Sequence, residues 1–258
     1  MNTLFQEYKE KGFLVIKDFF NDDEISNFTS HIDPIYNNWR IENKSEITQE
    51  KLVNMHSLSD PKYFSKTPKS RIDFFNAICP RKLVNHLRMI FGEDIFFNNT
   101  QVFFNPDAED KKPYWHRDLQ YSPISVADQK NEMHNILALH VRIPLLAEKG
   151  LELIPGSHQR WDTDLENKVR YQQDGFSSDF NLADSKLIDL NIGDMIIFSA
   201  QILHKGVYDL STERKALDIC FGNMHPLISQ YINPRVLPSN EEFKKIKNKQ
   251  WYHYKGTS

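Results

Sequence analysis

The N-terminal third of the chain shows helical patterns that one short strand-like run interrupts. Residues 2–11 have the apolar spacing of a short amphipathic helix, and the apolar run 13–16 predicts a strand. Residues 22–39 open with acidic side chains, as helix N-termini favour, and residues 80–91 repeat apolar positions at helical spacing. Residues 40–70 are polar and poorly periodic. We expect a loop-rich surface connection over this last range.

From residue 95 onward the apolar pattern changes to a period of two, which is typical of strands with one buried face. Within 135–145, for example, apolar side chains alternate with His140 and Arg142. Residues 159–182 are polar and irregular, so we expect a long excursion there. The expected strands are 95–105, a strand through His116 after the polar loop 106–113, 135–145, a short strand with a tight turn over 150–158, 187–190, 195–198 running on to 204, and 214–221. Short strands preceded by helices predict a mainly β fold, a sandwich or barrel with flanking helices.

No repeat or low-complexity linker divides the chain. We therefore expect residues 1–258 to form one domain. Its helical N-terminal part covers about 1–93, its β core about 94–224 and its C-terminal extension 225–258. The basic segment 241–249 of the extension is expected to be a solvated helix.

Composition narrows the classes of function. A net charge of −3 over 258 residues gives no basic footprint for nucleic acid. The N-terminus lacks an apolar signal core, and no apolar run approaches the roughly 20 residues of a membrane span. Two cysteines, Cys79 and Cys220, are too few for a disulfide framework and favour a reducing compartment. We expect a soluble cytoplasmic protein with a small-molecule substrate and without a nucleic-acid or membrane partner.

The strongest chemical signal is a His-x-Asp pair, His116 and Asp118, in the run Tyr-Trp-His-Arg-Asp. On a strand, residues i and i+2 point to the same face, so imidazole and carboxylate would meet at one point. The pair His31 and Asp33 has the same spacing but falls in a helical pattern, where residues i and i+2 diverge by roughly 200°. We therefore interpret only the first pair as metal ligands.

A second histidine would complete a 2-His-1-carboxylate triad, which suits Fe(II) and leaves positions open for substrate and O₂. We select His204 because it follows a strongly apolar strand introduced by a Gly-Asp turn. His158 is expected to stabilise its own turn instead. Arg214 lies ten residues beyond His204 and could neutralise the far carboxylate of a dicarboxylate cosubstrate. Alternation in 214–221 places Arg214 and Asp218 on the polar face of the strand.

Several segments occur in a recognisable order: the run 12–25, the pair with its flanks at 115–118, the turn 153–158, the strand 193–198 before His204, and then Arg214. Together they resemble the phytanoyl-CoA dioxygenase-like branch of the Fe(II)/2-oxoglutarate oxygenases. The resemblance covers about residues 5–222. It implies a double-stranded β-helix core, that is, a jelly roll of the cupin type.

The resemblance implies that the three candidate ligands hold Fe(II) and that O₂ is the oxidant. It also implies 2-oxoglutarate as cosubstrate, bound by Arg214 and contacted by the polar side chains of Gln101 and Asn105. Two positions depart from the family pattern. Gly206 stands where the family commonly has a serine that donates to 2-oxoglutarate, and Lys149-Gly150 stands where Asn-Gly is usual. These departures concern cosubstrate and substrate contacts rather than metal ligands.

The substrate is expected to be a small polar metabolite, a sugar or an amino-acid-like compound rather than an acyl-CoA. The reaction implied by the resemblance is hydroxylation of an unactivated C–H bond. Candidates for substrate contact are Arg142, His140, Tyr121, Trp161 and Asp218. Two other classes stay open: a jelly-roll protein that binds metal or 2-oxoglutarate as a sensor without turnover, and a hydrolase that uses zinc on the same core.

Overall fold

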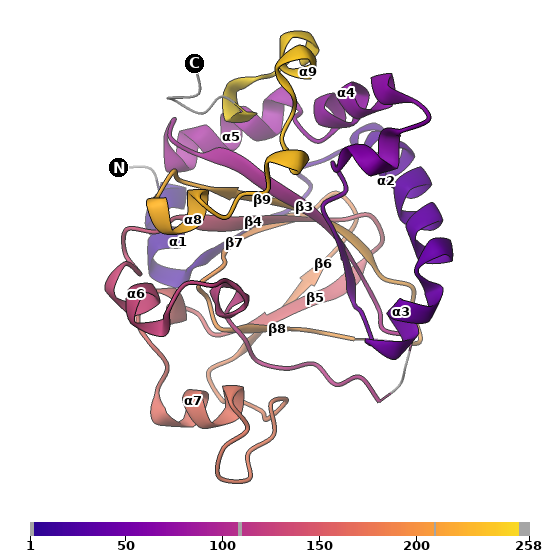
Figure 1. Ribbon diagram of the computed structural model, residues 1–258. Helices are drawn as coiled ribbons and strands as arrows, with labels where there is room; N and C mark the ends of the chain where they lie inside the picture. The colour runs from indigo at the N-terminus through magenta and orange to yellow at the C-terminus, as the bar shows by residue number, and fades with distance from the viewer. Residues whose placement is uncertain (1–2, 108–109, 209, 253–258) are drawn as a thin grey trace.

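Two facing sheets form the core of the protein, whose computed structural model describes residues 3–107, 110–208 and 210–252 (Figure 1). The strands are β1 (Phe13–Ile16), β2 (Asn54–His56), β3 (Phe96–Phe104), β4 (Ala138–Pro144), β5 (Glu148–Leu153), β6 (Lys186–Leu190), β7 (Met195–Ser199), β8 (His204–Gly206) and β9 (Lys215–Gly222). One sheet has the order β1-β7-β4-β9-β3-β2 and the other β6-β5-β8. An isolated antiparallel bridge between His116 and His204 extends the smaller sheet beyond β8. The predicted jelly-roll core is confirmed.

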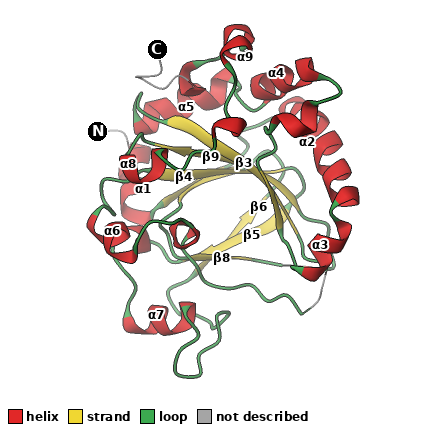
Figure 2. Ribbon diagram, viewed as in Figure 1, coloured by secondary structure: helices red, strands yellow, loops and turns green. Residues whose placement is uncertain are grey.

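Helices cover the outer face of the six-stranded sheet (Figure 2). The α-helices are α1 (Thr3–Lys11), α2 (Asp22–Glu42), α3 (Lys44–Gln49), α4 (Pro68–Ala77), α5 (Arg81–Phe91), α6 (Val126–Asn131), α7 (Asp164–Arg170), α8 (Pro226–Ser229) and α9 (Asn240–Lys245). α2 begins with a capping box in which Asn21 and Glu24 satisfy each other's backbone N–H groups. Its buried Phe28 and Ile32 join α5 and the sheet in one apolar cluster. The predicted helices over 2–11, 22–39 and 80–91 therefore form on the face that the β core needs to cover.

Alternation along the central strands separates an apolar outer face from an inner face. On β4, Leu139 and Val141 pack toward the helices, whereas His140 and Arg142 line the space between the sheets. On β7, Ile196 and Phe198 point inward instead and join a second apolar cluster with β5 and β6. That second cluster holds the two sheets together, and the polar inner positions are left to line a cavity.

The predicted loop over residues 40–70 is wrong. This range contains α3, β2, a 3₁₀ turn over Pro61–Phe64 and the start of α4. β2 pairs with β3 and brings Asn54 opposite Phe103. A three-residue strand has too few positions to show a period, and its stability comes from pairing with a distant strand.

The expected strand through His116 and Asp118 is reduced to one bridge, and a 3₁₀ turn begins at Asp118. Arg117 between them keeps an extended conformation, with φ −116° and ψ 135°, so the argument from residues i and i+2 still holds locally. The predicted irregular excursion over 159–182 contains α7. Its start carries a capping box between Thr163 and Glu166, a signal that is present in the sequence.

The C-terminal extension is not solely a solvated tail. Lys244 and Lys245 of α9 are exposed as expected, but Trp251 and Tyr252 are buried and join the main apolar cluster. Residues 253–258 of the predicted extension lie outside the described residues. Among the described residues, no helix has both the length and the apolar character to span a bilayer.

Candidate active site

Backbone hydrogen bonds bring the three predicted ligands together at the edge of the smaller sheet. The His116 N–H donates to the His204 carbonyl over 2.9 Å, and the His204 N–H returns a bond of 3.0 Å. The Asp118 N–H donates to the carbonyl of Ala200 over 2.9 Å. These bonds fix segments that are more than 80 residues apart in the chain (His116 to His204 is 88 positions). The site therefore depends on the pairing of β8 with the His116 segment.

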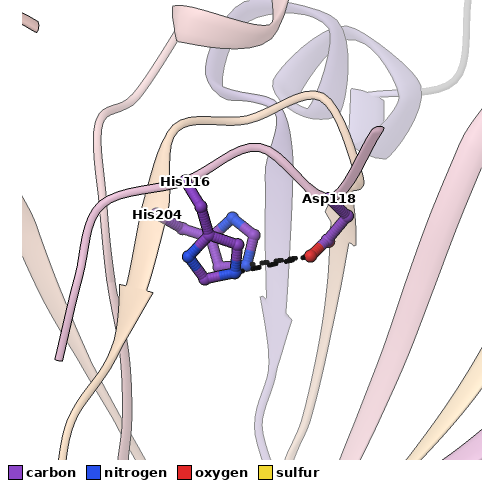
Figure 3. Close-up of side chains that lie close together, drawn as sticks. All are labelled: His116, Asp118 and His204. Atoms are coloured by element: carbon purple, nitrogen blue, oxygen red, sulfur yellow. Dashed lines mark ion pairs between the residues drawn. The ribbon is translucent and has the colours of Figure 1, made fainter. Parts of the chain in front are cut away.

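The side chains of His116, Asp118 and His204 converge on one point (Figure 3). Their ligand atoms all lie within 4.8 Å of one another. The Nε2 atoms of His116 and His204 are 3.5 and 3.7 Å from Oδ1 of Asp118. Two ligands each about 2.1 Å from one ion at right angles would be about 3.0 Å apart, so a small contraction suffices to close this triad around a metal.

Both imidazoles are oriented for metal binding. Nδ1 of His116 lies 2.9 Å from the Tyr114 carbonyl, and Nδ1 of His204 lies 3.0 Å from the Ile202 carbonyl. A carbonyl only accepts, so each Nδ1 carries the hydrogen and each Nε2 offers its lone pair to the centre. Burial also lowers the pKa of His204 to about 3, which keeps the ring neutral.

The carboxylate of Asp118 is held in its charged form. Removal from water alone would raise its pKa, but the facing imidazoles, with His204 and His140 foremost, outweigh that effect and lower the pKa. Two imidazoles and one carboxylate are the donor set of the facial triad that suits Fe(II). The residues present therefore fit this metal.

The triad lies in a cavity of about 500 Å³ between the sheets. Such a volume is within the range of small-molecule sites. Apolar side chains from both sheets line part of the cavity, and the other lining side chains are mostly polar or charged. The lining residues are Val53, Asn54, His56, Gln101, Phe103, Tyr114, His116, Asp118, Tyr121, His140, Arg142, Leu151, Phe198, His204, Gly206, Tyr208, Arg214, Asp218 and Cys220.

A chain of charged contacts leads from the triad into the cavity wall. Nε2 of His140 lies 3.2 Å from Oδ2 of Asp118, and its Nδ1 lies 3.2 Å from Asp218. Arg142 closes the chain with a two-point contact to Asp218, at 2.7 Å from Nε and 3.0 Å from Nη2. His140 thus contacts Oδ2 of Asp118, the carboxylate oxygen that does not face His116 and His204.

Arg214 lines the cavity just before β9 begins. It is 5% exposed, its Nε donates to the buried carboxylate of Glu148, and Nη2 lies 3.4 Å from the Gly150 carbonyl. Gly206 lies beside the guanidinium, since a Cβ there would be 3.7 Å from Nη1 of Arg214. The position that the family commonly gives to serine is therefore directly next to the predicted cosubstrate arginine.

Most of the other predicted site residues also line the cavity: Gln101, His140, Arg142, Tyr121 and Asp218. Asn105 does not, because its Nδ2 donates to the Thr212 carbonyl over 2.7 Å and its side chain lines a smaller pocket behind Arg214. Trp161 also lies outside the cavity and packs against the cations of Arg117 and Lys130. Alternation along the strand predicted that the Asn105 side chain would share the inner face, but Asn105 lies just beyond the end of β3 and its side chain is outside the cavity.

Sequence reasoning missed several lining residues. Asn54 and His56 come from β2, and Asn54 donates to Gln101 over 2.8 Å. Tyr114 and Tyr208 stand near the triad and near Gly206, respectively. Tyr114 immediately precedes the His-x-Asp segment, which is a local signal. β2 carries no such signal because its role depends on pairing with β3.

Comparison with known proteins finds ectoine dioxygenases among the curated relatives of this chain. Ectoine dioxygenase of Bordetella parapertussis (strain 12822) is 21% identical over 165 residues, which is 60% of this chain and 49% of that protein. Ectoine dioxygenase of Streptomyces avermitilis is 22% identical over 158 residues, with 60% and 50% covered. The chain thus spans about half the length of the curated relatives it matches.

Solved structures share the fold. EctD from S. alaskensis with 2-oxoglutarate and 5-hydroxyectoine has a TM-score of 0.58 at 13% identity, with 86% of this chain and 76% of that chain covered. HygX from Streptomyces hygroscopicus with iron bound has a TM-score of 0.60 at 13% identity, covering 86% and 87%. The sequence model of the phytanoyl-CoA dioxygenase (PhyH) family matches residues 8–216, and the chain therefore belongs to this family.

Proposed function

We propose that the protein is an Fe(II)- and 2-oxoglutarate-dependent dioxygenase that hydroxylates a C–H bond of a small polar metabolite. The observation that carries the proposal is the convergence of two histidines and one carboxylate in a cavity that also contains an arginine. Membership of the PhyH family supports it. So do the names of the ectoine dioxygenases, and the titles of EctD with 2-oxoglutarate and of HygX with iron.

In this proposal His116, Asp118 and His204 would hold Fe(II), a donor set that leaves coordination positions available for cosubstrate and O₂. The bound iron would supply the oxidation, in which 2-oxoglutarate is decarboxylated to succinate and the substrate C–H is hydroxylated. His140 keeps the Asp118 carboxylate oriented through its contact with Oδ2. Arg214 receives the far carboxylate of 2-oxoglutarate, because its Nη1 edge lines the cavity beside Gly206.

The walls of the cavity support a small polar substrate. Asn54 and His56 present amide and imidazole groups on one side, and Tyr114 and Tyr121 present hydroxyl groups joined by a 3.1 Å hydrogen bond. These neutral donors and acceptors match a sugar, a polar metabolite or an amino-acid-like compound better than an acyl chain.

A cytoplasmic location without a nucleic-acid partner also belongs to the proposal. Both cysteines are free, with Cys79 buried and Cys220 lining the cavity, as a reducing compartment requires. The near-neutral charge of −3 offers no footprint for a polyanion.

The first test is anaerobic reconstitution of the protein with Fe(II) and 2-oxoglutarate, followed by its visible spectrum. We expect a weak metal-to-ligand charge-transfer band in the visible range. The band should be lost at the same cosubstrate concentration in Arg214→Ala. It should persist in Arg235→Ala, which removes an exposed arginine paired with Asp60 outside the cavity. A folded, iron-loaded wild-type protein without the band would contradict the cosubstrate assignment.

The metal ligands are tested by turnover of 2-oxoglutarate to succinate. His116→Ala and Asp118→Ala should reduce iron-dependent succinate release to background, because each removes one of three ligands. His31→Ala is the matched control, since its His-x-Asp pair lies on α2, away from the cavity. Retained turnover in both ligand variants would refute the triad, and activity restored by Zn²⁺ without 2-oxoglutarate would favour the hydrolase class.

A further inference from the structure

We propose that Arg142 is a second arginine for the cosubstrate, which binds the far carboxylate of 2-oxoglutarate together with Arg214. This inference rests on the proposed function. It assigns a ligand to the guanidinium of Arg142, which has no role in the proposed metal site or in the proposed contact of Arg214 with 2-oxoglutarate. The site then recognises the dicarboxylate through two guanidinium groups that come from adjacent strands, β4 and the start of β9.

The guanidinium of Arg142 is buried and only partly satisfied. The residue is 2% exposed, and Asp218 takes its Nε and Nη2 hydrogens at 2.7 and 3.0 Å. Nη1 has no hydrogen-bond partner among the described residues, and Arg142 lines the cavity. Leaving a buried charged donor unpaired is costly, so an acceptor that enters the cavity would be bound strongly at this edge.

Arg142 and Arg214 lie against the same aromatic ring. The Cζ atoms of Arg142 and Arg214 are 4.2 and 6.0 Å from the centroid of Phe103, and all three side chains line the cavity. β9 pairs with β4 so that Asp218 lies opposite Arg142, and Arg214 precedes the first residue of the same strand. The two guanidinium groups therefore belong to one end of the inner wall.

Arg214 alone has few free donors. Its Nε is taken by Glu148, and Nη2 faces the Gly150 carbonyl at 3.4 Å. A carboxylate can accept about four hydrogen bonds. The donors that Arg214 has left are too few to satisfy this carboxylate, and Gly206, which lies beside the Arg214 guanidinium, has no side chain to donate. Nη1 of Arg142 supplies a further charged donor.

The geometry favours the cosubstrate over the substrate as the ligand of Arg142. Arg142 is two residues from His140, which contacts Asp118, and it lies between that contact and Arg214 along the inner wall. A chelator that reaches from the triad to Arg214 must pass it. The neutral groups that could face a substrate, such as Asn54 and His56, come instead from β2 at the far edge of the sheet.

The test compares two ligands of the Fe(II)-loaded protein under anaerobic conditions by calorimetry. 2-Oxoglutarate and 2-oxovalerate share the chelating end and the five-carbon chain, but only the first has a far carboxylate. We expect Arg142→Gln to weaken 2-oxoglutarate binding by at least about tenfold while 2-oxovalerate binding is unchanged, because one charge-assisted hydrogen bond is lost. Arg142→Gln combined with Arg214→Ala should abolish the preference.

Arg142→Gln leaves Asp218 without its partner and could impair folding, so Arg142→Gln/Asp218→Asn is measured alongside it. This pair replaces the buried ion pair by two amides and should show the same loss of preference. Arg71→Gln is the matched control, because Arg71 is also buried, pairs with Glu242 at 2.5 Å and lies outside the cavity. It should lower the melting temperature without changing the preference.

The outcomes separate this inference from the proposed function. If both Arg142 variants keep the wild-type preference for 2-oxoglutarate, Arg142 does not bind the cosubstrate and the inference is overturned while the proposed function stands. If the iron-loaded wild type does not prefer 2-oxoglutarate over 2-oxovalerate, the proposed function itself is overturned. Loss of preference in the Arg142 variants alone supports the inference.

Discussion

At the scale of single residues, Arg117 shows how the His-x-Asp segment is fixed from behind. Its side chain points away from the ligands on either side of it, is 1% exposed and donates to Asp162 at 2.9 Å and to the Ser157 carbonyl at 2.8 Å. Arg170 of α7 pairs with the other oxygen of Asp162. The buried carboxylate of Asp162 thus connects the segment of His116 and Asp118 to the long segment that follows β5.

We predict that Asp162→Ala destabilises the protein by about 3–5 kcal/mol, because it leaves two buried guanidinium groups without their carboxylate. Urea unfolding followed by circular dichroism measures the change. Asp164→Ala, an exposed change at the start of α7, should alter the free energy of unfolding by less than about 0.5 kcal/mol. Equal stability of the two variants would show that the buried cluster contributes little.

At the scale of elements, the junction between α1 and β1 needs glycine for two reasons. Gly12 has φ +82°, in the left-handed region, and a Cβ there would lie 2.4 Å from Nδ1 of His158. His158 packs against Tyr8 of α1 and lies away from the triad, in line with its predicted structural role. The turn after β5 is therefore held against the N-terminal helix.

We predict that Gly12→Ala lowers the free energy of unfolding by about 2–4 kcal/mol, since it adds a clash to the backbone cost of a positive φ. Gly92→Ala is the matched control: its φ is +85°, and nothing lies within 4 Å of the added Cβ. It should cost only about 1 kcal/mol. Chemical denaturation measures both variants. His158→Ala should recover part of the loss in the Gly12 variant, and no recovery would argue against the clash.

At the scale of the whole molecule, the two ends of the chain are joined through the main apolar cluster. Trp251 is fully buried with its ring centroid 4.5 Å from that of Phe221, and Tyr252 packs against Phe75 and Phe97 at 5.2 and 5.3 Å. The extension thus caps the same sheet that carries the cavity on its inner face. Its stability and that of the site are coupled through β9 and β3.

We predict that Trp251→Ala costs about 3–5 kcal/mol, because the large cavity it leaves is far from solvent. Tyr231→Ala, also in the extension but with 50% of the residue exposed, should change stability by less than about 1 kcal/mol. Differential scanning calorimetry measures both. A cooperative transition at the wild-type temperature for Trp251→Ala would show that the extension is independent of the core.

Regular patterns could be interpreted without the structure, and short or paired elements could not. The alternation on β4 and β9 and the helical spacing in α5 reflect long stretches with one buried face, so local sequence was sufficient. β2 has three residues and exists because β3 offers a free edge. α4 was missed because the residues before it are polar and poorly periodic, although its Phe74 and Phe75 are buried in the main apolar cluster.

The sequence by itself determined the mainly β class, and residue types, local spacing and the family resemblance were enough to predict His116, Asp118, His204 and Arg214 as site residues. The structure brings these four side chains to one cavity, and their roles stay predictions. Only the tertiary structure decided which polar side chains share the cavity. Strand register places Asp218 opposite both Arg142 and Gln101. The pairing of β2 brings Asn54 to the cavity, while Asn105 and Trp161 fall outside it. The physical reason is that register and packing join residues far apart in the chain, and no local pattern records which of them meet.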